Sequence, residues 1–168
     1  MKLLFNFKVL CGLSILLFGS SFLIGYLMGE YTSIVKNQEE LIIHTPGLEL
    51  TLDLFTNNIT ICLLLLLGIV TFGIPTLFYL LLNGFVLGIG VNDLISIGIP
   101  LNEFFMKLLP HAILEIPAFI LSGAIGLYGF TFYLGYRIQI RPFLNYTIII
   151  ITMISLAAFI EGYISTSF

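Results

Sequence analysis

Charged residues are scarce in this sequence, and tryptophan is absent from it. Asp, Glu, Lys and Arg make up 9% of the 168 residues, whereas hydrophobic residues make up 59%. A water-soluble fold needs a charged surface, so this composition excludes a soluble globular domain and indicates an integral membrane protein. The few basic residues form no patch, and we therefore expect no nucleic-acid partner. Without tryptophan, tyrosine and phenylalanine must supply the aromatic side chains at the membrane interfaces.

Cysteine is nearly absent as well. The two cysteines, Cys11 and Cys62, both lie inside apolar segments. We interpret them as small apolar core residues and not as a disulfide. No serine or cysteine has a base beside it in the sequence, so no covalent nucleophile can be identified.

Long apolar runs dominate what is present. The first run, over residues 9–28, is longer than the core of a secretory signal and precedes no Ala-x-Ala cleavage site, so we expect a transmembrane helix. The second block, Leu54 to Val91, would span about 57 Å as one helix, nearly twice the hydrocarbon thickness. It must therefore contain two helices, and Gly73, Ile74 and Pro75 mark the break between them.

The sequence thus predicts an all-α integral membrane protein, a bundle of about five transmembrane helices that forms one membrane domain over residues 1–168. Residues 102–109 are expected to form a short amphipathic helix at the interface before the fourth span. Pro110 suits the first turn of that span, where a proline costs little. The expected helices cover residues 9–28, 55–73, 75–91, 110–136 and 144–163, and an acidic outer loop covers 30–53.

The distribution of basic residues favours one orientation in the cell membrane. Basic residues concentrate on one side of the expected spans: Lys2, Lys8, Arg137 and Arg141 against Lys36 and Lys107. Because cytoplasmic segments carry the excess of Lys and Arg, we expect the N-terminus in the cytoplasm and the C-terminus outside.

Polar side chains are rare in the expected spans, and they lie near one membrane face. His111 and Glu115 are four residues apart, so they share a face of the fourth helix. Others reach a similar depth, within about 12 Å of that face by helical rise: Asn57, Asn58, Asn83 and Glu161. Polar residues at helix ends can simply extend to water. Asn83 is too deep for that and Glu115 is too short, so we favour a convergent polar pocket.

One imidazole and two carboxylates form a plausible ligand set for a divalent metal such as zinc, with His111, Glu115 and Glu161 as the ligands. Beside a metal-activated water, Glu115 or Glu161 could act as a general base, which makes both candidate catalytic residues. A hydrogen-bonded His–Glu pair that only orients helices is an equally natural interpretation. The sequence leaves open whether the protein is an enzyme, because His-x-x-x-Glu is a weak signature alone.

Several segments together carry a resemblance to a known family. They are, in chain order, Phe55–Asn58, Gly68–Gly73, Leu82–Gly88, Leu109–Ala118 and Ala157–Ile164. In these segments the sequence resembles the stage II sporulation protein M family of small polytopic membrane proteins. The Pro-His-x-x-x-Glu-x-Pro-Ala core is the specific part, and Ala112 stands where relatives usually carry glycine.

The resemblance implies a membrane partner or scaffold. The named member works with a peptidoglycan-degrading complex during sporulation, and shorter relatives accompany circular bacteriocins, where they are implicated in maturation, export or immunity. We therefore expect a role in envelope remodelling or in bacteriocin maturation or export.

Two alternatives stay open: an intramembrane metal-dependent peptidase or peptide ligase (cyclase) acting on an apolar peptide, and a small ion or substrate transporter. The expected partners are the lipid bilayer and either other membrane or envelope proteins or such a peptide. Small residues at helix spacing also fit a homo-oligomer.

Overall fold

The computed structural model describes residues 7–32, 46–135 and 141–163, and within these residues the chain is helical and holds no strand. Five helices in this described part of the chain are long and apolar enough to cross a membrane, which confirms the predicted fold class. They are α1 (Phe7–Thr32), α2 (Leu48–Leu67), α3 (Ile74–Ser96), α4 (Leu101–Leu127) and α5 (Leu144–Tyr163). Two 3-10 helices, η2 (Tyr128–Leu134) and η3 (Arg141–Phe143), lie between α4 and α5.

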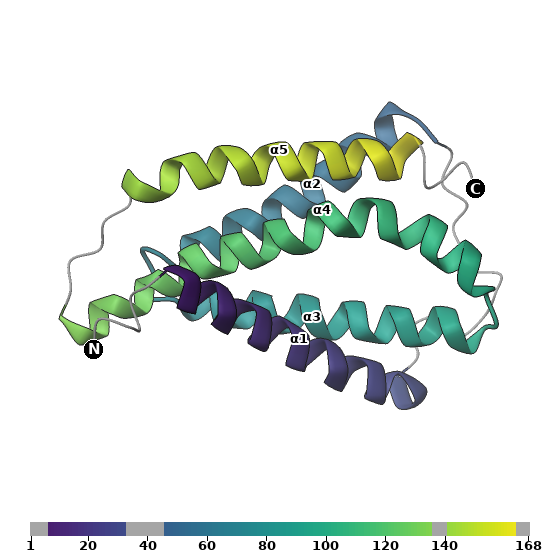
Figure 1. Ribbon diagram of the computed structural model, residues 1–168, viewed down its shortest axis with the longest axis horizontal. Coiled ribbons are helices and arrows are strands. Elements are labelled where there is room, and N and C mark those ends of the chain that lie inside the picture. The colour runs from purple at the N-terminus through teal and green to yellow at the C-terminus, as the bar shows by residue number, and fades with distance from the viewer. Residues whose placement is uncertain (1–6, 33–45, 136–140, 164–168) are drawn as a thin grey trace.

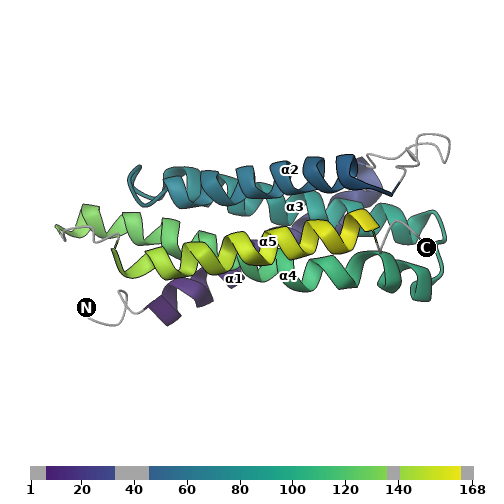
Figure 2. The same ribbon diagram turned by 90° about the horizontal axis from the view of Figure 1, so that it is seen from above.

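The helices lie lengthwise beside one another, with α1 and α3 on one side of the bundle and α5 on the other (Figure 1). Figure 2 shows the same arrangement from above, with α2 beside α5 and with α4 crossing behind α5 in that view. Helix α4 packs against each of the other four helices. Half of its apolar span is buried, against 22–28% for the other spans, so α4 is the central helix of the bundle.

The break between α2 and α3 falls where the sequence predicts it, although α2 ends earlier than expected. Helix α2 stops at Leu67, and a tight turn closed by the Gly73 N–H on the Gly68 carbonyl at 2.7 Å follows. Gly73 has a φ of 80°, which glycine adopts at no steric cost, and Pro75 occupies the first turn of α3. At its other end α3 continues to Ser96, beyond the expected end at residue 91.

Part of the expected outer loop is helical. The prediction of a loop over residues 30–53 is wrong at both ends, because α1 runs on to Thr32 and α2 already begins at Leu48. The stretch from Leu48 to Asp53 contains leucine and glutamate, which are good helix formers, and its acidic residues are exposed. Residues 33–45 of that loop lie outside the described residues.

The prediction of a separate interfacial helix over residues 102–109 is also wrong. Helix α4 runs without interruption from Leu101 to Leu127, with Pro110 and Pro117 inside it. A proline in a helix removes one hydrogen bond and crowds the carbonyl four residues earlier, but neighbouring helices can stabilise such a segment. The last turns of the expected fourth span are the 3-10 helix η2 and not α-helix, and its expected end at residue 136 lies outside the described residues.

At one end of the bundle, α4 touches α2 backbone to backbone. We call the contact formed by Gly68, Gly126, Gly129 and Thr76 the glycine clamp. A β-carbon at Gly126 would collide with the Leu65 carbonyl oxygen and the Thr76 hydroxyl, and one at Gly129 would collide with the Gly68 carbonyl oxygen. The buried Thr76 hydroxyl donates to the Leu65 carbonyl at 2.7 Å. The glycine clamp therefore joins the end of α2, the start of α3 and the end of α4.

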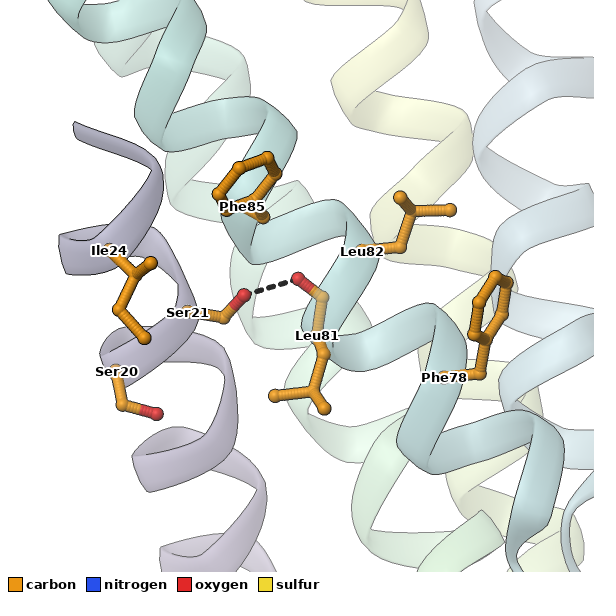
Figure 3. A pocket seen from close by; sticks show the side chains of 7 residues that line it. All are labelled: Ser20, Ser21, Ile24, Phe78, Leu81, Leu82 and Phe85. Carbon is orange, nitrogen blue, oxygen red and sulfur yellow. Dashed lines mark hydrogen bonds between the residues drawn. The ribbon is translucent and has the colours of Figure 1, made fainter. Parts of the chain in front are cut away.

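A second close contact joins α1 to α3. A β-carbon at Gly84 or Gly88 would collide with the backbone of α1, and the Ser21 hydroxyl donates to the Leu81 carbonyl (Figure 3). An open groove of about 380 Å³ lies along this contact. The other serine in it, Ser20, donates to the Leu17 carbonyl of its own helix at 3.1 Å. Because both hydroxyls are used on backbone carbonyls, the groove presents an apolar surface, as a lipid-facing surface requires.

The glycine clamp generates a stability prediction. Replacing Gly126 with alanine should lower the free energy of unfolding by about 1–3 kcal/mol, because the new methyl group forces α4 away from α2. Unfolding of the purified protein in detergent, by heat or by denaturant, measures this change.

The matched control is Gly19→Ala in α1, since a β-carbon there meets nothing within 4 Å. We expect its stability to equal or slightly exceed that of the wild type, because alanine favours helix over glycine. Equal stability of the two variants would contradict the glycine clamp.

Candidate metal centre

The centre of the candidate site is one face of α4. His111 and Glu115 lie one helical turn apart on this face, as their spacing predicts. His111 is buried and Glu115 is half-buried. Further along the same face, Ala118 and Ser122 are small and fully buried, so α4 approaches its neighbours closely just below the two polar side chains.

Glu161 joins this pair from α5. The two helices pack against each other, and the last turns of α5 lie beside the first half of α4 (Figure 1). The Nε2 atom of His111 lies 3.9 Å from Oε1 of Glu161. One potential ligand atom from each of His111, Glu115 and Glu161 lies within 4.8 Å of the others.

This spacing is close to that of a metal centre. Two ligand atoms on a tetrahedral zinc ion at about 2.0–2.2 Å lie about 3.3–3.6 Å apart. The separations of up to 4.8 Å therefore have to shorten by about 1 Å, which side-chain rotation can supply, to close around an ion. Two carboxylates held together in an apolar span are costly, and a divalent cation between them would compensate both charges.

Asn58 of α2 completes the cluster. It is buried, and its Nδ2 atom donates to Oε1 of Glu115. The neighbouring Asn57 is exposed and donates to Oδ1 of Asn58 at 3.5 Å, which puts it at the edge of the site. Asn83 is placed differently: it is half-buried on α3, and its Nδ2 atom donates to the Tyr79 carbonyl of its own helix at 2.7 Å. Its amide group is thus hydrogen-bonded within α3 and not to the cluster.

Beneath the cluster lies a layer that sequence reasoning did not assign to the site. Cys62 follows Asn58 by one turn of α2 and is fully buried with a free thiol, beside the hydroxyl of Ser122. The spacings of four residues from Asn58 to Cys62 and seven from Glu115 to Ser122 are the signals that place them beneath it.

Two further buried polar residues, Asn92 and Asp93, lie in the last turns of α3. Asn92 accepts a hydrogen bond from the Ser96 hydroxyl at 3.4 Å and packs against Gly29 of α1. Both lie beyond the helix end predicted at residue 91, so the sequence does not predict them among the buried polar groups of the spans.

The end of α5 that carries Glu161 is attached to the start of α2. The Gly47 N–H donates to the Gly162 carbonyl at 3.1 Å. A β-carbon at Gly162 would collide with the side chain of Thr51, whose hydroxyl donates to the Gly47 carbonyl at 3.0 Å. These contacts set the position of Glu161 along α4, although none of them involves a potential ligand.

The fold and the site together define a multi-span helical membrane protein with a partly buried His–Glu–Glu cluster. The chain matches the sequence model described as Stage II sporulation protein M over residues 14–166, and it belongs to this family (SpoIIM). It is also similar to an uncharacterized protein from Methanocaldococcus jannaschii, with 32% identity over 164 residues that cover 91% of this chain and 92% of that protein. No solved structure matches the chain. The family predicted from the sequence is thereby confirmed.

The contact at Gly162 generates a prediction about the site. Replacing Gly162 with alanine should move the end of α5 and Glu161 with it, because the methyl group collides with Thr51. We expect the affinity of the purified protein for zinc to fall about tenfold, as when the support of a metal ligand is lost. Competition with a chromophoric chelator measures the affinity.

Gly90→Ala is the control, since a β-carbon at this position in α3 meets nothing within 4 Å. It should bind zinc as the wild type does. If Gly162→Ala binds zinc with wild-type affinity, the end of α5 does not determine the position of the third ligand.

Proposed function

We propose that this SpoIIM-family protein is an intramembrane metalloprotein that binds one divalent cation, zinc first, and uses it on a peptide bond of an apolar peptide. The observation that carries the proposal is the cluster of His111, Glu115 and Glu161, whose potential ligand atoms lie within 4.8 Å of one another. Imidazole and carboxylate together suit zinc, and a set of three protein ligands leaves a fourth position for water.

An open fourth position supports a catalytic and not only a structural ion. Structural zinc sites are closed by four protein ligands, whereas catalytic sites keep a water that the metal makes nucleophilic near neutral pH. The side chain of Glu161 is 26% exposed and that of His111 is 9% exposed, so access is from the side of α5. Apolar side chains such as Ile113 cover the outer surface of α4, which favours a substrate that resides in the bilayer.

In hydrolysis, the oxygen of the water bonds to the peptide carbonyl carbon and the carbon–nitrogen bond breaks. With an ion held by the three side chains, a carboxylate oxygen outside its ligand set would take a proton from the water and pass it to the leaving nitrogen. Glu161 is the better base because it is accessible, while Oε1 of Glu115 already accepts a hydrogen bond from Asn58. In ligation, a peptide amine takes the place of water, so one carbon–nitrogen bond forms as another breaks.

The second candidate is a non-enzymatic scaffold. Two polar contacts, Asn58 with Glu115 and His111 with Glu161, connect α2, α4 and α5 without any ion. In this function the cluster only maintains the shape of the bundle, and the protein acts as a membrane partner in envelope remodelling or in bacteriocin maturation or export. Its metal content then separates the two functions.

The metal content of the purified protein distinguishes the metalloprotein from the scaffold. We expect about one zinc ion per chain in the protein purified from zinc-supplemented cells, and at least a tenfold lower content in His111→Ala and Glu161→Gln. Glu49→Gln is the matched control, because Glu49 is an exposed carboxylate in the first turn of α2 and should leave the metal content unchanged. Wild-type protein that retains no metal would exclude the metalloprotein and leave the scaffold.

The orientation in the membrane is part of the proposal. Lys8 at the start of α1 and Arg141 just before α5 are exposed. The starts of α1 and α5 lie at one end of the bundle, and the start of α4 and the end of α5, which carry the cluster, lie at the other (Figure 1). The positive-inside rule therefore supports a cytoplasmic N-terminus and a site that opens to the outer face.

A reporter fused after the C-terminus tests this orientation. Alkaline phosphatase is active only outside the cytoplasm, and we expect it to be active when fused to the C-terminus. A fluorescent protein that matures only in the cytoplasm should remain dark at the same position. The opposite pair of results would reverse the orientation and would place the site at the inner face.

A further inference from the structure

We infer that Asn58 determines which metal the site accepts. It keeps Glu115 as a monodentate ligand, with one carboxylate oxygen on the ion, and so favours zinc over calcium. The inference rests on the proposed metal centre and adds a selectivity to it. Asn58 itself is a positioning residue, because it acts on the ion through Glu115.

The first support is the hydrogen bond between the two side chains. Asn58 comes from α2 and Glu115 from α4, and the Nδ2 atom of Asn58 donates to Oε1 of Glu115. The amide must face the carboxylate with its NH₂ group, because a carboxylate oxygen can only accept. The oxygen of the Asn58 amide accepts from Nδ2 of Asn57 at 3.5 Å, which is consistent with this orientation.

The second support is burial. Asn58 is 8% exposed and Glu115 is half-buried, so little water competes for their hydrogen bond. In such surroundings a carboxylate keeps its donor, since breaking the bond would leave a buried polar group without a partner. Oε1 of Glu115 thus stays engaged with Asn58, and Oε2 is the oxygen that keeps both of its lone pairs for the ion.

The consequence for the metal follows from coordination chemistry. Calcium takes six to eight oxygen ligands at about 2.3–2.6 Å and commonly uses both oxygens of a glutamate. Zinc takes four ligands at about 2.0–2.2 Å and accepts imidazole readily. A Glu115 restricted to one oxygen, together with His111, therefore suits zinc and leaves calcium short of ligands.

Asn83 offers a natural comparison within the same chain. It is also an asparagine within an apolar span, but its amide donates to the Tyr79 carbonyl of its own helix and not to the cluster. Replacing Asn83 thus removes a polar group from a span without touching Glu115. It separates a general effect of losing an intramembrane amide from the specific effect of losing the donor to Glu115.

The experiment measures zinc and calcium affinities of the wild type, Asn58→Ala and Asn83→Ala by chelator competition in detergent. We expect the zinc affinity of Asn58→Ala to fall about 10- to 100-fold. Its calcium affinity should stay or rise, because Glu115 can then offer both oxygens. The zinc-to-calcium ratio should therefore fall at least tenfold in Asn58→Ala and stay unchanged in Asn83→Ala.

A readout on the wild type keeps the inference testable if Asn58→Ala does not fold. X-ray absorption at the zinc edge should give four nitrogen or oxygen ligands, as a one-oxygen Glu115 requires. Five or more ligands, or an unchanged zinc-to-calcium ratio in Asn58→Ala, would overturn the selectivity role of Asn58 and leave the metal centre intact. Wild-type protein without zinc affinity would instead overturn the proposed function itself.

Discussion

The bundle depends on the backbone-to-backbone approach of α4 to α2 in the glycine clamp. In a membrane, the hydrophobic effect does not drive helices together, so close packing of small residues must supply much of the attraction. Gly126 of α4 and Gly129 of η2 allow this approach, and the Thr76 hydroxyl adds a hydrogen bond to the Leu65 carbonyl. With one end of the α2–α4 pair set at contact distance, the geometry of the other end can be controlled by few interactions.

That other end is controlled by polar contacts. Asn58 of α2 donates to Glu115 of α4, and His111 of α4 lies 3.9 Å from Glu161 of α5. The same pair of helices is thus joined by dispersion contacts at one end and by a partly buried hydrogen bond at the other. This division explains how a small protein can keep ionisable groups in an apolar bundle: the glycine clamp maintains the fold, and the polar end is available for function.

Much of the fold could be predicted from the sequence, because apolar runs must match the thickness of a bilayer. The sharing of one face by His111 and Glu115 follows from helical periodicity in the same way. The continuity of α4 through Pro110 could not be predicted, since the local cost of a proline does not reveal the packing that offsets it. The partner of Asn83 depends on the rotation of α3 about its axis, which composition and spacing do not determine. Orientation and metal binding stay predictions.

The position of Glu161 in the last turn of α5 has an electrostatic consequence. The peptide dipoles of a helix add up, so its C-terminal end carries about half a negative charge. Glu161 is placed two residues before the end of α5, where its carboxylate and the helix end repel each other. A cation beside Glu161 would relieve this repulsion and compensate Glu115 at the same time. The helix that delivers the second carboxylate thus also contributes, through its backbone, to a negative potential at the cluster.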